Sequence, residues 1–234
     1  MQPVQYNKQH NQNRNLTLHY DAWYQGQSVL AKPDQPLITQ YLDRINNTID
    51  EALSHYSRIT AFWFVLKLPF GYPLGDTDNS LMTQFWKSVK SRIEADRLRA
   101  HRDNARAHDT GVFYVWAREY NEDETAPHWH CALMVNQDAY CSMGSIHSEQ
   151  QNMYHRIASA WAQVLGLSEH QVQGLMHCPD HPEYHLNLNG AGQDREALFH
   201  RLSYMAKAPT KVYQDKIHAF GCSRTRRAGA SSRG

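Results

Sequence analysis

The longest apolar run in the chain predicts a buried strand. Residues 59–68 read ITAFWFVLKL, which is almost entirely apolar, aromatic or β-branched, and a Pro-Phe-Gly sequence ends the run. Two further β-like runs, 111–119 and 127–135, are joined by the polar stretch 120–127. We therefore expect these two runs to pair as a hairpin.

Elsewhere, apolar residues recur at helical spacing. Four segments show this pattern: 36–56, which follows a predicted cap at Asp34, then 79–107, 148–165, and the stretch from Asp194 to Pro209. Short strand candidates lie at 172–176 and 184–188. From residue 59 the order is β-α-β-β-α-β followed by a helix, which predicts an α+β fold with a central antiparallel sheet of the split β-α-β, ferredoxin-like type. We expect the helices to lie mainly on one face of the sheet.

A chain of 234 residues is long enough for one substantial core. Residues 1–15 are rich in Gln and Asn, and we expect them to form a disordered tail. Residues 16–57 would form an N-terminal extension with an amphipathic helix, and 58–224 the single main domain. Residues 225–234 would form a basic disordered tail.

Composition and charge limit the possible functions. The formal net charge is +1, so the chain is not a generally basic nucleic-acid-coating protein, and any contact with nucleic acid depends on local patches. The four cysteines show no CxxC spacing, which predicts neither a disulfide framework nor a four-cysteine zinc site. Without a signal-peptide pattern or an apolar run long enough to cross a bilayer, we expect a soluble cytoplasmic protein with no membrane partner.

A pair of histidines inside the strand 127–135 is the first candidate for chemistry. His128 and His130 are two residues apart, so in a strand they point to the same face, while Trp129 and Cys131 point to the other. Imidazole is a ligand for Mn, Fe, Ni, Cu and Zn, and a third ligand with oxygen would extend the choice towards Mg and Mn. The pattern therefore predicts a divalent metal site.

The predicted hairpin supplies a third ligand. Glu119 ends the strand that precedes the histidines, and directly opposed residues of antiparallel strands have Cβ atoms about 4.5–5.5 Å apart. Glu119 is thus within reach of a metal shared with His128; the alternative is that it is a solvated strand end. Glu122 and Glu124, in the presumed turn, are weaker candidates.

The last predicted helix carries a tyrosine and a lysine off its apolar face. Tyr204, Lys207 and His200 share one side at 100° per residue, and Leu202 and Met205 lie on the other. A phenol has a pKa of about 10 and is a poor nucleophile unless a cation or base assists it. With thirteen tyrosines in the chain, a core or rim position is the alternative.

Taken together, these motifs resemble those of a known superfamily. The sequence His128-Trp129-His130 with Glu119 upstream, and Tyr204-Met205-Ala206-Lys207 downstream, resembles the HUH endonucleases, in which U is a hydrophobic residue. The chain looks most similar to inovirus-type and prophage replication initiators, the group also described as the YagK/YfjJ carboxy-terminal domain family. Three more stretches share this similarity: 116–119, 133–136 and 219–224. The resemblance covers roughly residues 56–224.

The resemblance implies rolling-circle replication initiation in a bacterial host cell. His128, His130 and Glu119 would bind Mg or Mn, and Tyr204 would attack a phosphate of single-stranded origin DNA, forming a 5′-phosphotyrosine and releasing a 3′-hydroxyl. Lys207 would steady the phosphate or the phenolate. A second tyrosine, Tyr213, follows Pro209, so we expect a single nucleophile. Because the chain lacks a GxxxxGK[ST] loop, a host helicase and a polymerase would be partners.

The positive charge near the C-terminus predicts where DNA binds. Residues 195–234 contain nine Lys or Arg against two acidic residues, a local excess of +7. The expected DNA contacts are Arg201, Lys211, Lys216, Arg224, Arg226 and Arg227. A second basic stretch, 87–106, also contains acidic residues, and a solvated helix face explains it equally well.

Other functions stay open at this point. The histidine-rich stretch 177–185, with Cys178 and Asp180, could hold a structural zinc, or could be a polar loop. The chain could also be a catalytically inactive prophage DNA-binding regulator. An HUH strand transferase for transposition or mobilisation would use the same residues.

Overall fold

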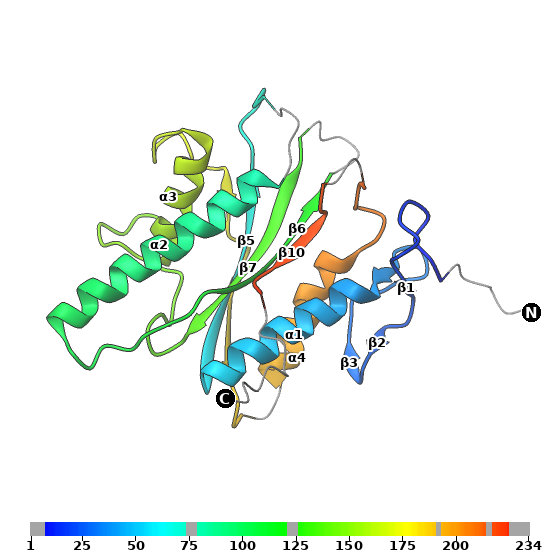
Figure 1. Ribbon diagram of the computed structural model, residues 1–234, viewed down its shortest axis with the longest axis horizontal. Coiled ribbons are helices and arrows are strands. Elements are labelled where there is room, and N and C mark those ends of the chain that lie inside the picture. Colours follow the sequence, from blue (N-terminus) through cyan, green and yellow to red (C-terminus); the bar gives the residue numbers. More distant parts are fainter. Residues whose placement is uncertain (1–7, 74–78, 121–125, 191–192, 214–216, 225–234) are drawn as a thin grey trace, which may run out of the picture.

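The computed structural model describes residues 8–73, 79–120, 126–190, 193–213 and 217–224. Within these residues the chain is an α+β protein with four α-helices and a six-stranded antiparallel sheet. The strands of this sheet are β5 (Arg58–Lys67), β6 (Phe113–Glu119), β7 (His128–Asn136), β8 (Met176–His177), β9 (Glu183–Asn187) and β10 (Phe220–Cys222). Their order is β10-β6-β7-β5-β8, and β9 also pairs with β5 (Figure 1).

Strand β5 is the predicted buried strand, and it lies next to the predicted hairpin. It pairs with β7 from Ile59 opposite Asn136 to Lys67 opposite His128. On its other edge, β9 and β8 pair with successive parts of β5. The predicted hairpin of β6 and β7 is confirmed, because the two strands pair antiparallel over the full length of β6.

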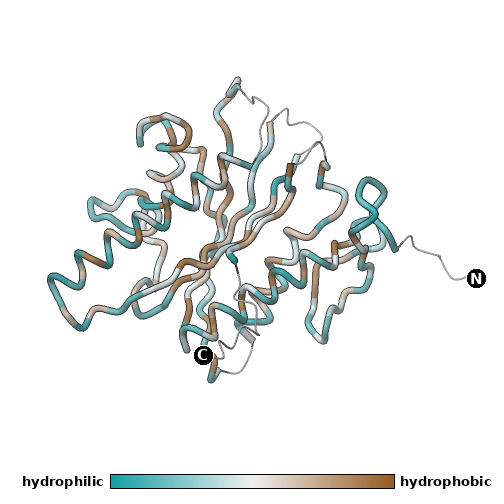
Figure 2. Tube along the Cα trace, in the orientation of Figure 1, coloured by the Kyte–Doolittle hydropathy of each residue, from teal (hydrophilic) through white to brown (hydrophobic). Residues whose placement is uncertain are grey.

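Both faces of the sheet are covered, which corrects the expectation of helices mainly on one face. Helices α2 (Ser80–Asp103) and α3 (Met153–Leu165) pack with Phe62 and Phe64 of β5. Helices α1 (Thr39–His55) and α4 (Gln193–Ser203) belong to the core on the opposite face. The reason is that β5 is apolar at every position from 59 to 66 except Thr60, so each of its faces needs a cover. Figure 2 shows apolar residues concentrated in the sheet and polar ones on the outer helix faces.

The helix boundaries differ from the expected ones at four ends, one of them the end of α2, which stops at Asp103 and not at residue 107. Helix α1 begins only at Thr39, because Leu37 and Ile38 first form a short strand, so Asp34 does not cap it. Helix α3 begins at Met153, where the Asn152 side chain accepts a hydrogen bond from the backbone N–H of His155. Helix α4 ends at Ser203 and continues as a 3₁₀ turn, η1 (Tyr204–Ala206).

The N-terminal extension forms two small strand pairs beside α1 and α4. In one, β1 (Leu18–His19) pairs with β4 (Leu37–Ile38); in the other, β2 (Trp23–Tyr24) pairs with β3 (Gln27–Ser28). Residues 8–15 of the expected tail lie in the described part of the chain and make specific contacts. Gln9 bridges to Thr17, and His10 is buried with its ring 4.8 Å from that of Tyr213. Residues 1–7 and 225–234 lie outside the described part.

No helix in the described residues is both long enough and apolar enough to cross a membrane.

Candidate metal centre

The β6–β7 hairpin brings three potential ligands to one face of the sheet. Glu119 is directly opposite His128, and Ala117 is opposite His130, so the carboxylate and both imidazoles project to the side covered by α1 and α4. Trp129 and Cys131 lie in the core under α2 and α3. The alternation along β7 therefore separates the ligands from the apolar residues between them.

These three side chains form a compact group. One ligand atom from each lies within 4.8 Å of the others. The Nε2 atoms of His128 and His130 are 3.2 Å apart, and His130 Nε2 is 3.5 Å from Oε2 of Glu119. Glu119 is almost fully buried, and His128 is buried as well. The group is therefore a compact and largely buried cluster.

The chemistry of the donors fits a divalent cation. In the described part of the chain, Glu119 Oε2 and His130 Nδ1 are buried without a hydrogen-bond partner. Burial first, and then the nearby basic side chains, among them His128 and Lys211, lower the pKa of His130 to about 3. His130 is therefore neutral near pH 7 and offers a lone pair. One carboxylate and two imidazoles suit Mn, Zn and similar ions.

Lys211 is a fourth member of this group. Its Nζ donates to Glu119 Oε1 at 2.5 Å, and its side chain has no exposed surface. We expected Lys211 to be an exposed DNA contact, and its position instead is inside the cluster, where it balances the charge of Glu119. The sequence gives no signal for this pairing, because the two residues are 92 positions apart.

Tyr204 lies beside the three ligands. Its ring is 4.9 Å from the ring of His130, and the Nζ of Lys207 is 4.2 Å from its centroid. Burial and the carboxylate of Glu119 raise the pKa of Tyr204, while Arg201 lowers it. The structure thus brings together Tyr204, Lys207 and the predicted ligands, although Tyr204 stands in the 3₁₀ turn and not within the helix.

Trp63 forms the apolar wall of the site, a role that sequence reasoning missed. Its ring is 5.5 Å from that of His130 and 6.4 Å from that of Tyr204. The guanidinium carbon of Arg201 lies 5.4 Å from the same indole. The alternation of side chains along β5 could have predicted this position, because Trp63 lies on the opposite face of the strand from Phe62 and Phe64.

Of the remaining predicted DNA contacts, only Arg224 lies in the part of the chain that the structure describes. Arg224 is exposed just after β10. Lys216, Arg226 and Arg227 lie outside the described residues, as do Glu122 and Glu124.

Tyr213 has a separate environment. Its hydroxyl is 2.9 Å from that of Tyr41, and burial, followed by Tyr41, raises the pKa of Tyr213.

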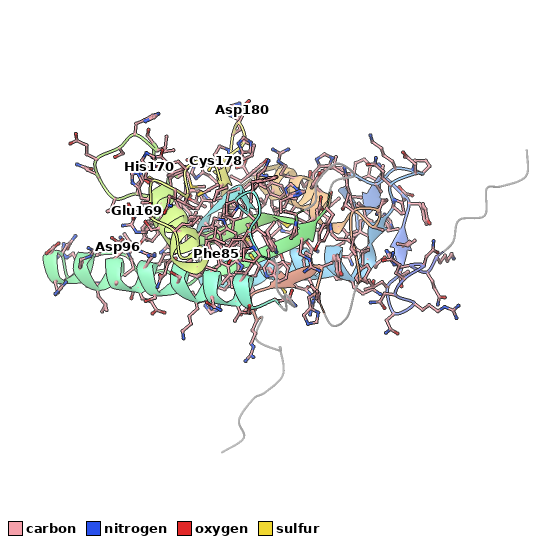
Figure 3. The ribbon with its side chains drawn as sticks, turned by 90° about the horizontal axis from the view of Figure 1, so that it is seen from above. Phe85, Asp96, Glu169, His170, Cys178 and Asp180 are labelled. Carbon is pink, nitrogen blue, oxygen red and sulfur yellow. The ribbon has the colours of Figure 1, made fainter. Side chains whose placement is uncertain are left out.

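The histidine-rich stretch does not assemble a metal site in the part of the chain that is described. His185 contacts Thr60 and Gln137 through Nδ1. Figure 3 shows Asp180 projecting outward from the loop that also carries Cys178. Across the described ranges, the only group of three or more metal-ligating side chains is Glu119, His128 and His130.

Fold and site together define an α+β protein with a buried Glu-His-His group that could hold a metal ion. Residues 20–223 match the family model of the YagK/YfjJ C-terminal domain, and the chain belongs to this family. It is 30% identical to the uncharacterized protein YagK of Escherichia coli strain K12 over 195 residues, which cover 80% of this chain and 93% of YagK. It is 27% identical to the uncharacterized protein YfjJ of the same strain over 203 residues, covering 80% of this chain and 95% of YfjJ. No solved structure matches the chain.

Proposed function

We propose that this protein is a metal-dependent single-strand DNA endonuclease of the HUH type that initiates rolling-circle replication, with Tyr204 as its nucleophile. The observation that carries the proposal is the position of the Tyr204 ring, 4.9 Å from that of His130 in the Glu119-His128-His130 group. A tyrosine beside a carboxylate and two imidazoles has the parts needed to attack a phosphate.

The arrangement of the sheet supports this assignment. The strands run in the order β6-β7-β5-β8, and both β6 and β5 are antiparallel to β7 between them. Helices α2 and α3, which follow β5 and β7 in the chain, pack in the same core. We propose that the domain has the split β-α-β fold of ferredoxin-like type, and this strand order and pairing support the proposal.

Each residue has a distinct part in the proposed reaction. Glu119, His128 and His130 would hold Mg or Mn, which when bound polarises the scissile phosphate and offsets the negative charge of the transition state. The Tyr204 oxygen forms a bond to phosphorus as the bond from phosphorus to the 3′ oxygen breaks. The phenol loses its proton, and the leaving oxygen gains one to become a 3′-hydroxyl.

The product retains the strand for later rejoining. Tyr204 then carries the 5′ phosphate as a phosphodiester, so attack by a 3′-hydroxyl can reverse the step and restore a continuous strand. Since burial and Glu119 raise the pKa of Tyr204, positive charge is needed beside the phenol. Lys207 and Arg201 supply that charge, and Lys207 is close enough to steady the phenolate.

A denaturing gel tests the proposal. The purified chain is incubated with Mn²⁺ and a pool of labelled single-stranded oligonucleotides that includes hairpins from its own genomic neighbourhood. We expect a denaturant-resistant protein–DNA adduct that EDTA prevents, and peptide mass spectrometry should place the nucleotide on Tyr204. Tyr204→Phe should abolish the adduct, and Tyr213→Phe should retain it.

Three other results would overturn the proposed nucleophile or the proposed function. An adduct that persists in Tyr204→Phe and disappears in Tyr213→Phe would transfer the nucleophile to the second tyrosine. Sequence-specific DNA binding without any adduct would favour the regulator. Adduct formation at transposon or plasmid ends, and not at a replication origin, would favour a strand transferase.

A further inference from the structure

A groove rich in arginine lies on the side of the sheet opposite the candidate metal centre. Arg92, Arg99 and Arg102 of α2 and Arg156 of α3 line it, and its volume is about 660 Å³. We call it the arginine groove. We propose that it binds the phosphate backbone of duplex DNA without regard to sequence, as a second DNA contact separate from Tyr204.

The spacing of the arginines suits repeated phosphates. At 1.5 Å per residue, Arg92 and Arg99 are about 10 Å apart along the helix axis, and Arg102 is about 4.5 Å further on. A guanidinium presents a planar set of donors that matches phosphate oxygens. A single phosphate would engage only part of such a row, whereas a nucleic-acid backbone would engage all of it.

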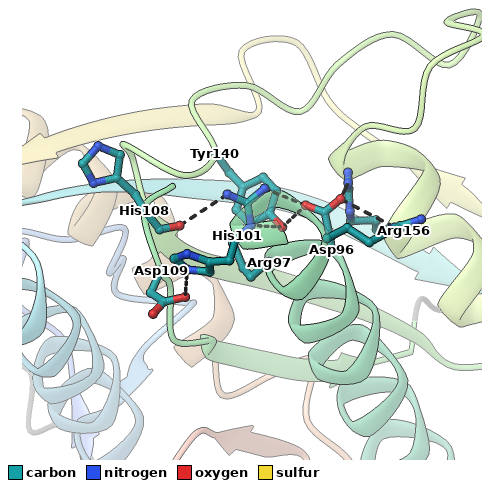
Figure 4. A network of polar contacts seen from close by, with 8 residues as sticks. Asp96, Arg97, His101, His108, Asp109, Tyr140 and Arg156 are labelled. Atoms are coloured by element: carbon teal, nitrogen blue, oxygen red, sulfur yellow. Dashed lines mark hydrogen bonds and ion pairs between the residues drawn. The ribbon is translucent and has the colours of Figure 1, made fainter. Parts of the chain in front are cut away.

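The charge of the groove is only partly balanced by the protein. Asp96 accepts hydrogen bonds from Arg97, Tyr140 and Arg156, a network visible in Figure 4, and Arg99 lies 3.7 Å from the same carboxylate. One carboxylate thus faces three guanidiniums. Asp96 also accepts the hydrogen bond that holds Arg156, which is one of the lining residues of the groove.

Two other arginines keep their charge available. Arg92 donates to the backbone oxygen of Ser159 and to Gln163, both of which are neutral. Arg102 is exposed and has no ion-pair partner in the part of the chain that the structure describes. The groove therefore has an excess of positive charge that an anionic ligand would balance.

The lining favours a duplex over a single strand. No aromatic side chain lines the arginine groove. Sites for single strands combine positive charge with aromatic rings on which bases stack, whereas backbone contacts to a duplex need only cations and hydrogen-bond donors.

The basic surface also continues along α2. Lys87 and Arg92 also line a neighbouring groove on this helix, and no aromatic side chain lines that groove either. From Lys87 to Arg102 this surface follows α2 for about 22 Å along the helix axis, roughly two thirds of one turn of duplex DNA. We choose DNA over RNA as the ligand because of the proposed function. The inference that the ligand carries phosphates depends only on the arginines of the groove.

Salt-dependent binding of a labelled duplex of arbitrary sequence tests this site. Fluorescence anisotropy is measured in EDTA at several KCl concentrations for the full chain and for Arg99→Gln/Arg102→Gln. Loss of two phosphate contacts should reduce the slope of log affinity against log salt by about two, and should weaken binding equally for unrelated sequences. The matched control is Arg14→Gln/Arg44→Gln, which removes two exposed arginines elsewhere and should leave the slope unchanged.

Several results would overturn the inference. An unchanged slope in the Arg99/Arg102 variant would exclude the groove, and an equal loss in the control would show a general charge effect. If the variant loses more affinity for a single strand of the same sequence than for the duplex, the ligand of the groove is single-stranded. If the wild type binds duplex RNA more tightly than duplex DNA, the assignment to DNA is wrong. Because EDTA prevents nicking, failure here leaves the Tyr204 adduct test intact, and failure of the adduct test leaves this binding intact.

Discussion

The ammonium of Lys211 lies 2.5 Å from Oε1 of Glu119, and neither side chain is more than 1% exposed. A buried carboxylate is costly unless a counter-charge and hydrogen bonds compensate it. Lys211 supplies that charge on one oxygen of Glu119. The other oxygen faces His130 Nε2 at 3.5 Å, so the pair stabilises the carboxylate beside the two imidazoles.

Breaking this pair should destabilise the protein strongly. Lys211→Met leaves the Glu119 carboxylate buried without its partner, and we expect a loss of about 3–5 kcal/mol in the free energy of unfolding without metal. Because the variant frees Glu119 for a cation, Mn²⁺ should stabilise it more than it stabilises the wild type. Urea unfolding with and without Mn²⁺ measures both effects.

The same substitution at Lys207 is the control for that prediction. Lys207 is only partly buried and lies over the ring of Tyr204, so Lys207→Met should cost about 0.5–1 kcal/mol. If Lys211→Met unfolds at the same urea concentration as the wild type, the pair contributes nothing to stability.

Metal binding should stabilise the fold through Glu119, His128 and His130. With Mn²⁺ or Zn²⁺ at 100 times its dissociation constant, the expected gain is about 2.7 kcal/mol, seen as a rise in melting temperature. His128→Ala should remove this rise, because it deletes one of three ligands. In contrast, the metal should still raise the melting temperature of His185→Ala. If this rise is lost in His185→Ala, the result would instead support a zinc site in the 177–185 stretch.

Asp96 should make part of the stability dependent on pH. Burial raises the pKa of Asp96, but hydrogen bonds from Arg97, Tyr140 and Arg156 outweigh this effect and lower it to about 2, from 3.8 (Figure 4). Since the pKa is lower in the folded state, the contribution is complete above pH 3.8 and is lost as the pH falls towards 2. The contribution of the ionised Asp96 side chain to the free energy of unfolding is about 2 kcal/mol.

Comparison with Asp96→Asn isolates this effect. The variant should be less stable than the wild type at pH 7, and the difference should decrease as the pH falls from 4 to about 2. Urea unfolding across this range measures it. If the difference in unfolding free energy between the wild type and Asp96→Asn stays constant with pH, the charge of Asp96 does not contribute to stability.

Gly221 should tolerate no side chain. It pairs with Trp116 across β10 and β6, and a Cβ atom at this position would lie 2.5 Å from the indole of Trp116. Gly221→Ala should therefore displace Trp116 and cost about 1–3 kcal/mol. Thermal unfolding and near-UV circular dichroism test this, with Cys222→Ala as the neighbouring control; an unperturbed tryptophan signal would contradict the clash.

Local pattern was sufficient for most of the secondary structure. The apolar run at 59–68 predicted β5, and the polar stretch between two β-like runs predicted the β6–β7 hairpin. The alternation of side chains along β7 then placed His128 and His130 on one face, opposite Trp129. These features depend on residues close in sequence, so periodicity is enough to predict them.

The hydrophobic pattern was not sufficient to predict the structure where the same local sequence is compatible with two kinds of secondary structure. The spacing of Leu202 and Met205 continues through Tyr204, and it predicted one helix up to Pro209, whereas the chain tightens into a 3₁₀ turn at Tyr204. Similarly, Asp34 looked like a cap, but pairing of Leu37 and Ile38 with β1 delays the helix.

The sequence by itself determined β5, the β6–β7 hairpin, β9, the approximate helices and the shared face of the two histidines, because each follows from backbone geometry over a few residues; it placed a strand at 172–176, where the chain turns before β8, and it did not predict β1 to β4. Only the tertiary structure decided that α1 and α4 cover the second face of the sheet, that Tyr204 meets His130, and that Lys211 is buried against Glu119. Those contacts join distant segments, and the free energy of burying apolar surface and balancing charge in the folded core selects them.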